Sequence, residues 1–290
     1  MTPQLGPRSR PWRSWLFVPA DNERVLTASG TRGADVIICD LEDAVADSDK
    51  RAARQLLSSK LAGLAGSAAA ICVRVNSGLE LPSDLAVAVH PAVDVVMLPK
   101  VESCEEITDL ARQIAVRECE NGQVVGRIGI VALIETPRGV LRLPDIAPAP
   151  GLVGLAFGSE DYSAHLGVGA TDTLLETPVS MIAIAAAAER LMSIGTGTSL
   201  RNFGDPEQFQ AAAARARDRG MTGALCIHPS QVAAVNRAFE LAAEDVAWAQ
   251  LVIARWNSSE AGVSALDGQM IDKPVLERAK NILRDASSRS

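Results

Sequence analysis

Short apolar segments rich in β-branched residues recur along the chain and alternate with longer amphipathic segments. Each apolar segment is too short for a typical helix and ends in turn-forming or charged residues, which is typical of buried strands. These predicted strands cover residues 14–19, 35–41, 70–75, 93–99, 127–134, 152–157 and 223–228, with a weaker eighth near 192–195. Helical spacing predicts helices over 50–65, 102–120, 178–191 and 205–219, a helical region over 230–256 and a last helix over 275–284.

This alternation of strand and helix predicts a parallel sheet with right-handed crossovers. The strands are continuously apolar, as in sheets that are buried on both faces. Eight of them favour an α/β fold of the (β/α)₈ TIM-barrel type with a C-terminal helical extension or lid. An open doubly wound sheet is the alternative, although no GxGxxG follows the first strand. We expect a flexible N-terminus over 1–12, a barrel over 13–256, and a lid segment and helix over 257–290.

Composition narrows the function classes. The chain has 290 residues, of which 48% are apolar, and a formal net charge of −7. A nucleic-acid-binding protein needs a basic face, so an acidic chain disfavours that class. No uncharged apolar stretch approaches the ~18 residues of a membrane helix, and residues 1–13 lack the apolar core of a secretion signal. The five cysteines form no CxxC pair and fit reduced thiols, so we expect a cytoplasmic protein.

Charged side chains gather where the predicted strands end. In a (β/α)₈ barrel the C-terminal ends of the strands meet at one mouth, where active sites lie. The charged residues that directly follow or end these strands are Asp40, Glu42, Asp43, Arg74, Lys100, Glu102, Glu135, Glu160 and Asp161. Gathering so many charges in one cleft costs desolvation unless a metal or opposite charges neutralise them.

Glu135 and Asp161 follow the fifth and sixth strands and should therefore lie near each other. Two carboxylates without His or Cys ligands suit a hard cation, Mg²⁺ above others. The alternative is that each carboxylate caps the helix after it. Arg74 ends an apolar strand, where a lone cation needs an anionic partner. It could bind a carboxylate or thioester oxygen of a substrate, or form an internal ion pair with Glu42 or Asp43.

Eight short segments, in order, resemble the citrate lyase β-subunit-like family. This family belongs to the HpcH/HpaI aldolase group, with malyl-CoA and citramalyl-CoA lyases among its relatives. The resemblance covers about residues 13–285. The segments are RSWLFVPADN (13–22), GADVIICDLEDAV (33–45), VRVN (73–76), DVVMLPKVES (94–103), LIETPRG (133–139), FGSEDYSAHLG (157–167), IHPSQVAAVN (227–236) and LDGQMID (266–272).

The resemblance implies a (β/α)₈ barrel, Mg²⁺, a trimer or hexamer, and cleavage of a 3-hydroxyacyl-CoA thioester to a 2-oxo acid and acetyl-CoA. It also implies roles for individual residues. Glu135 and Asp161 resemble the metal ligands, and Gly158, Ser159 and Glu160 lie in the same motif and would bind substrate. Arg74 resembles the arginine that anchors the substrate, while Glu42 and Asp43 resemble acids near a metal-bound water. Asp272 resembles an aspartate that enters the neighbouring subunit's site, and Arg13 would lie towards the CoA.

One segment departs from the family pattern. Many relatives place an acid directly after the seventh strand, but here residues 193–205 read SIGTGTSLRNFGD. This departure leaves the size of the substrate and the position of CoA open. The sequence also does not choose between citramalyl-CoA, which would give pyruvate, and malyl-CoA, which would give glyoxylate, because these products differ by one methyl group. Three other functional hypotheses also stay open. The chain could be a citrate lyase β subunit that acts on a citryl thioester of an acyl-carrier protein, a metal-dependent aldolase of free hydroxy-oxo acids, or a non-catalytic paralogue.

Overall fold

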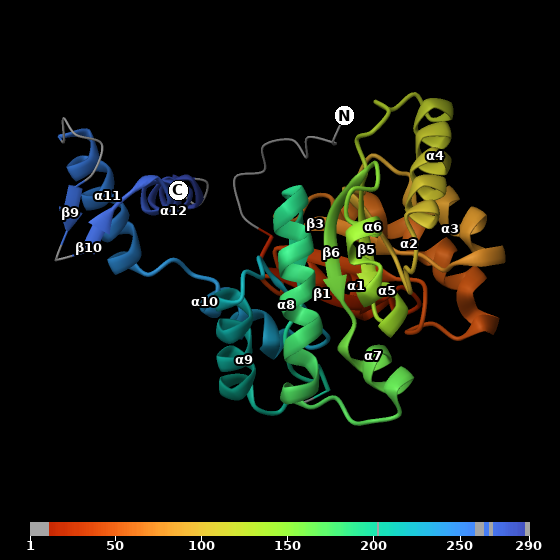
Figure 1. The fold of residues 1–290 in the computed structure, drawn as a ribbon. Coiled ribbons are helices and arrows are strands. Elements are labelled where there is room, and N and C mark those ends of the chain that lie inside the picture. Colours follow the sequence, from red (N-terminus) through yellow and green to blue (C-terminus); the bar gives the residue numbers. More distant parts are fainter. Residues whose placement is uncertain (1–11, 202, 259–263, 267–268, 288–290) are drawn as a thin grey trace. The chain divides into compact units, whose positions relative to one another are not determined.

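Eight parallel strands form a nearly closed barrel in the computed structural model, which describes residues 12–201, 203–258, 264–266 and 269–287 (Figure 1). Their order in the sheet is β7-β6-β5-β4-β3-β2-β1-β8, and a single bridge between Ile194 and Gly223 links the two edges. The predicted (β/α)₈ fold is confirmed. The strands are β1 (Ser14–Pro19), β2 (Val36–Asp40), β3 (Ala70–Arg74), β4 (Val95–Leu98), β5 (Gly129–Ile134), β6 (Leu152–Phe157), β7 (Met192–Ile194) and β8 (Ala224–Cys226).

Strands β2 to β6 are buried at every position, so apolar residues face both the barrel interior and the surrounding helices. This explains the continuous apolar runs in the sequence. The outer helices are α1 (Glu23–Ser29), α2 (Lys50–Leu64), α3 (Leu81–Ala88), α4 (Cys104–Glu120), α5 (Pro137–Leu141), α6 (Leu143–Ile146), α7 (Ser159–Leu166), α8 (Asp172–Glu189), α9 (Pro206–Asp218) and α10 (Pro229–Ala238). Two 3₁₀ turns, η1 (Asp47–Asp49) and η2 (Gly78–Glu80), precede α2 and α3.

Two predicted helices differ in the structure. Helix α8 begins at Asp172 and carries Pro178 inside it, whereas the predicted helix over 178–191 begins at the proline. Leu175 and Val179, on either side of the proline, are both fully buried, so packing continues the helix across it. The predicted helical region over 230–256 is two helices, because α10 ends at Ala238 and α11 (Ala243–Asn257) begins after a short connection.

The chain divides into two compact units, and the described parts of these units are 12–239 and 240–287. The second unit contains α11, the hairpin of β9 (Ser264–Leu266) and β10 (Gln269–Ile271), and α12 (Lys273–Ser287). Its small core includes Ala249, Val252, Ile271 and Ala279. The first unit therefore ends at Phe239, before the expected boundary at residue 256, because α11 packs on α12. The expected flexible N-terminus lies almost wholly outside the described residues.

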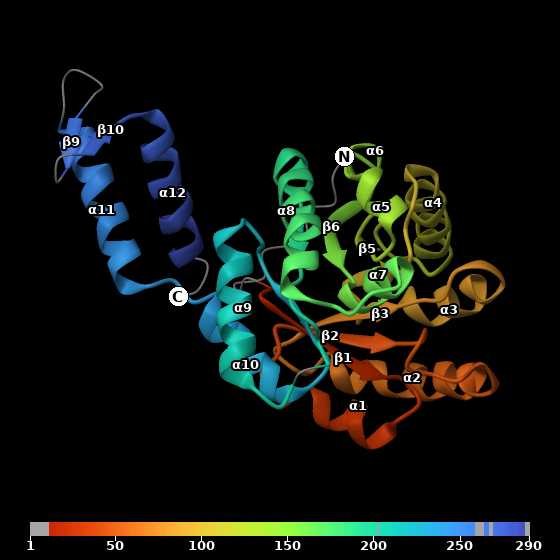
Figure 2. The ribbon, with the colours of Figure 1, turned by 60° about the horizontal axis from the view of Figure 1, so that its bottom comes forward.

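Figure 2 shows the barrel with α7 in front of the sheet, near the end at which β6 gives way to this helix. The carboxyl ends of the parallel strands share this end of the barrel, so the polar residues that follow them meet there. No helix among the described residues is long and apolar enough to cross a membrane.

Candidate active site

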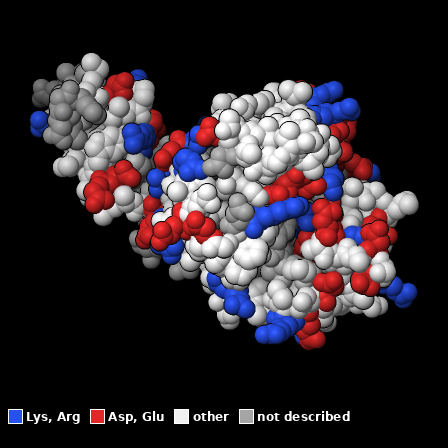
Figure 3. Space-filling view, turned by 90° about the horizontal axis from the view of Figure 1, so that it is seen from below, with Lys and Arg blue, Asp and Glu red and all other residues white. Residues whose placement is uncertain are grey.

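A cavity of about 340 Å³ opens at the C-terminal ends of the strands. Its walls come from the ends of β1, β2, β3, β5 and β8, the start of α7 and the loop after β7. The residues that line it are Phe17, Pro19, Asp40, Asp43, Ala44, Arg74, Leu133, Glu135, Gly158, Ser159, Glu160, Asp161, Leu200, Leu225 and Ile227. Acidic and basic residues are interspersed over this face of the barrel (Figure 3). The excess of acidic residues in the cavity lining is therefore confined to the cavity and is not a property of the whole face.

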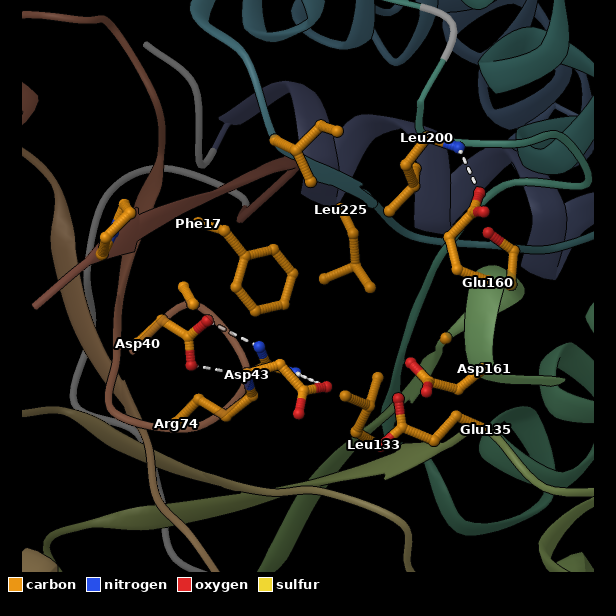
Figure 4. Close-up of a pocket in the computed structure, with 15 residues that line it drawn as sticks. Phe17, Asp40, Asp43, Arg74, Leu133, Glu135, Glu160, Asp161, Leu200 and Leu225 are labelled. Atoms are coloured by element: carbon orange, nitrogen blue, oxygen red, sulfur yellow. Dashed lines mark hydrogen bonds and ion pairs between the residues drawn. The ribbon is translucent and has the colours of Figure 1, made fainter. Parts of the chain in front are cut away.

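Glu135 and Asp161 lie next to each other at the edge of the cavity, with their carboxylates directed toward one another (Figure 4). Neither residue is a helix cap. Thr136 caps α5 by accepting a hydrogen bond from the Gly139 N–H, and the residue at the N-cap of α7 is Gly158. Neither carboxylate therefore acts as an N-cap, although Asp161 lies in the first turn of α7, where an acid interacts favourably with the helix dipole. Glu135 is only 1% exposed, and the one hydrogen bond to its carboxylate from the described residues is donated by the Lys100 backbone N–H, 2.8 Å away.

Burial, together with the nearby negative charge of Asp161, raises the pKa of Glu135 to about 8. A carboxylate in this position costs free energy unless positive charge lies beside it. The two oxygen donors fit Mg²⁺, which binds proteins through one or two carboxylates and leaves its other positions to water or substrate oxygens. The described residues contain no cluster of three or more His, Cys, Asp or Glu side chains suited to a metal. The acidic pair is therefore the metal-binding candidate in this part of the chain.

The start of α7 faces the same cavity. An added Cβ at Gly158 would lie 2.5 Å from Glu135 Oε2, so this position needs glycine to let the Glu135 side chain lie against the backbone. The next residue, Ser159, is 2% exposed, and its hydroxyl has no hydrogen-bond partner among the described residues. A buried hydroxyl without a partner at a helix N-terminus suits an anionic ligand such as a carboxylate.

Arg74 is held by two acids at the ends of neighbouring strands. Its Nε and Nη2 atoms donate to the two Asp40 carboxylate oxygens at 2.7 and 2.5 Å, and Nη1 lies 2.7 Å from Glu42 Oε2. The guanidinium carbon also lies 4.8 Å from the centre of the Phe17 ring. The structure thus gives Arg74 an internal ion pair. Of its five N–H donors, two remain beyond these three contacts.

Lys100 connects this ion-pair network to the Glu135 carboxylate. Its side-chain Nζ lies 2.7 Å from Glu42 Oε1, and its backbone adopts a left-handed conformation with φ of 53°. Such a conformation is uncommon for a residue other than glycine, and it often occurs at functional sites. Here it accompanies the hydrogen bond from the Lys100 backbone N–H to Glu135.

The structure brings most of the predicted site residues together. Asp43, Arg74, Glu135, Gly158, Ser159, Glu160 and Asp161 line the cavity, and Glu42 binds Arg74 beside it. Arg13 is not among them, because it precedes β1 at the opposite end of the strand and pairs with Asp35 at 3.0 Å. Asp272 belongs to the second unit, where its Oδ1 accepts a hydrogen bond from the Val275 N–H at the start of α12.

Three features of the site could not be read from local sequence patterns or received no role there. Asp40 stood among the charged strand ends but received no role, although it is the main partner of Arg74. The two residues lie opposite each other in the register of β2 and β3, and this register was the signal that could have paired them. The link from Lys100 to both glutamates depends on a left-handed backbone that the sequence does not signal. Leu200 enters the cavity from a loop that matched no motif.

Comparison with known proteins identifies the family. Residues 13–229 match the family model described as HpcH/HpaI aldolase/citrate lyase. The chain belongs to this family. The family description and the citrate lyase β-subunit relatives are those of lyases, and the predicted enzyme class is confirmed at that level.

Similar proteins extend over nearly the whole of this HpcH/HpaI-family chain. Citrate lyase subunit beta of Leuconostoc mesenteroides is 31% identical over 95% of the chain and 93% of its own length. A (3S)-malyl-CoA thioesterase of Cereibacter sphaeroides is 30% identical over 98% of each. Among solved structures, protein CitE of Mycobacterium tuberculosis in complex with magnesium, acetoacetate and coenzyme A is 32% identical, with a TM-score of 0.76 over 96% of this chain and 99% of that one.

The raised pKa of Glu135 predicts a pH-dependent stability without metal. The folded protein binds this proton more tightly than the unfolded chain, so the stabilising contribution is complete below pH 4.5 and is lost as the pH rises through 8. One pKa unit corresponds to about 1.4 kcal/mol. In EDTA, the unfolding free energy of the wild type should therefore fall by several kcal/mol between pH 5.5 and 9 relative to Glu135→Gln. Urea unfolding of both proteins measures this, and a pH-independent difference would contradict it.

Proposed function

We propose that this chain is a Mg²⁺-dependent carbon–carbon lyase that cleaves a 3-hydroxyacyl-CoA to a 2-oxo acid and an acyl-CoA. The single observation that carries the proposal is the pair of Glu135 and Asp161 at the mouth of the barrel. One carboxylate of this pair is almost fully buried, and the described residues give it one hydrogen-bond donor, the Lys100 backbone N–H. The magnesium and coenzyme A in the complex of the similar CitE protein support the same assignment.

Glu135 and Asp161 would hold the metal. When bound there, Mg²⁺ supplies a Lewis acid that polarises the substrate oxygen destined to become the carbonyl of the 2-oxo acid. The Ser159 hydroxyl and the first N–H groups of α7 would bind the adjacent substrate carboxylate, because they present donors to the cavity beside the acidic pair. This arrangement would orient the hydroxyl-bearing carbon toward the centre of the cavity.

Bond cleavage requires a base and a stabiliser of negative charge. We assign the base to Asp272 of a neighbouring subunit, following the resemblance of the LDGQMID segment, in a trimer or hexamer. Its carboxylate would take the hydroxyl proton as the carbon–carbon bond breaks. The bonding electrons pass to the thioester fragment as an enolate, which the remaining N–H donors of Arg74 would stabilise. A proton then returns to the enolate carbon and gives the acyl-CoA.

Glu42, Asp43 and Asp40 have supporting roles in this scheme. Asp40 and Glu42 fix the Arg74 guanidinium at the cavity wall, and Lys100 balances the charge of Glu42. Asp43 is 54% exposed at its side chain, lies 4.0 Å from Arg74 and faces the cavity. We propose that it orients water or substrate there.

The test is a side-by-side assay of malyl-CoA, citramalyl-CoA and citryl-CoA with Mg²⁺, following release of the 2-oxo acid, with EDTA as the control. The proposal predicts EDTA-sensitive cleavage of citramalyl-CoA or malyl-CoA. Absence of cleavage of all three esters by a folded, Mg²⁺-binding protein would overturn the proposal. Assays of a carrier-bound citryl thioester and of free hydroxy-oxo acids would then separate the citrate lyase β-subunit hypothesis from the aldolase hypothesis.

A further inference from the structure

The charges lining the cavity are unevenly distributed. Among the described lining residues, one cation, Arg74, faces five carboxylates. Arg74 is already bound to Asp40 and Glu42. A substrate that brings a further carboxylate, beyond the one next to its reacting carbon, would therefore enter a site where negative charge predominates.

The wall formed by the loop after β7 and by β8 is apolar. Leu200, Leu225 and Ile227 lie along it, and none of their side chains can donate a hydrogen bond. Figure 4 shows Leu200 and Leu225 above the acidic pair, with Asp40 and Arg74 on the other side of the cavity. A substituent on the carbon that bears the metal-bound oxygen, where it points toward this wall, meets methyl groups, and the described residues of the wall offer it no side-chain donor or cation.

Leu200 is fixed in this position by side chains of two different elements, the fully buried Gln231 and the half-buried Glu160. Its backbone N–H donates to Glu160 Oε1 at 3.1 Å, and its carbonyl accepts from Gln231 Nε2 at 2.8 Å. Gln231 is fully buried on α10, and Glu160 precedes Asp161 on α7. The Ser199 hydroxyl also donates to Glu160, at 2.6 Å. The atypical loop is therefore tied to the motif that carries the acidic pair.

We infer that Leu200 is a specificity-determining residue, and that it restricts the enzyme to 2-oxo acid products whose substituent is hydrogen or an uncharged alkyl group. The inference rests on the proposed function, which places the 2-oxo acid at Glu135 and Asp161. A substituent that ends in a carboxylate, as in oxaloacetate, would lose its hydration against Leu200 without gaining a hydrogen-bond donor or a cation, and binding would be weakened. A methyl substituent, as in pyruvate, would gain apolar contact with the same wall.

The experiment measures Mg²⁺-dependent binding of three 2-oxo acids to the full chain by titration calorimetry. The ligands are pyruvate, oxaloacetate, and 4-methyl-2-oxopentanoate, which has the branched shape of oxaloacetate but no second charge. We expect the Kd of pyruvate to be at least about tenfold below that of oxaloacetate, and the neutral branched acid to bind more tightly than oxaloacetate. Leu200→Arg should lower the ratio of the oxaloacetate Kd to the pyruvate Kd by about tenfold or more.

Two further variants control this experiment. Leu200→Ala removes bulk without adding charge, and it should strengthen binding of the neutral branched acid relative to pyruvate. Leu141→Arg makes the same Leu-to-Arg change at an exposed position on α5 outside the cavity, and it should leave the ratio unchanged. Equal wild-type affinities for pyruvate and oxaloacetate would overturn the inference alone. So would an oxaloacetate-to-pyruvate Kd ratio unchanged by Leu200→Arg together with a branched-acid-to-pyruvate ratio unchanged by Leu200→Ala. Absence of Mg²⁺-dependent binding of every acid would overturn the proposed function and this inference with it.

Discussion

Glu135→Gln is expected to lower Mg²⁺-dependent turnover by a factor of about 10³ or more. The substitution keeps the size of the side chain but removes one of the two charged oxygen donors of the proposed metal site. Loss of metal polarisation costs several kcal/mol of transition-state stabilisation, and each 1.4 kcal/mol corresponds to about tenfold in rate. Steady-state kinetics across a Mg²⁺ titration, together with calorimetric Mg²⁺ binding, measure the effect.

Glu118→Gln is the matched control for this substitution. Glu118 is also a fully buried glutamate, but its carboxylate accepts hydrogen bonds from the Gly126 and Ile128 N–H groups, away from the cavity. We expect this control to lose stability and to keep its Mg²⁺ affinity. If Glu135→Gln folded and retained Mg²⁺-dependent turnover, the metal role of Glu135 would be refuted.

Asp272→Asn is expected to lower kcat by about 10²–10⁴ while Mg²⁺ and pyruvate still bind. The loss corresponds to removal of a general base. Asparagine keeps a side-chain oxygen that can accept the hydrogen bond of the Val275 N–H, so the start of α12 should be preserved. Asp245→Asn, at an exposed acid in the first turn of α11, is the control and should leave kcat unchanged.

Mixing the two inactive variants tests whether the base comes from a neighbouring subunit. Co-assembled Asp272→Asn and Glu135→Gln chains would form some sites with an intact acidic pair from one chain and an intact Asp272 from another. We expect such mixed oligomers to recover measurable activity that neither variant has alone. Absence of recovery in verified mixed oligomers would place the base on the same chain as the metal ligands or exclude Asp272 from the reaction.

The barrel is predictable from the sequence because most strands are short, continuously apolar and followed by a helix. These local signals depend only on burial and periodicity. The acidic pair could also be predicted, since Glu135 and Asp161 follow consecutive strands that pair in the sheet. The pairing of β5 with β6 is enough to bring the residues that follow these two strands close together.

Other contacts depend on register and loop conformation, which local patterns do not determine. The Asp40–Arg74 pair requires β2 and β3 to align at their last residues. Leu200 reaches the cavity because Glu160 and Gln231 hold its backbone, and these side chains lie 40 and 31 residues away in the sequence. The break between α10 and α11 reflects packing of α11 on α12, which competes with the helical periodicity over 230–256.

The most direct test of the central claim is the product balance with the best thioester substrate under Mg²⁺. The account predicts that 2-oxo acid and acyl-CoA appear together in a one-to-one ratio, with no free CoA, and that EDTA stops both. Release of free CoA together with the intact hydroxy acid would contradict it. That result would mean hydrolysis of the thioester, the activity named for the similar protein of Cereibacter sphaeroides.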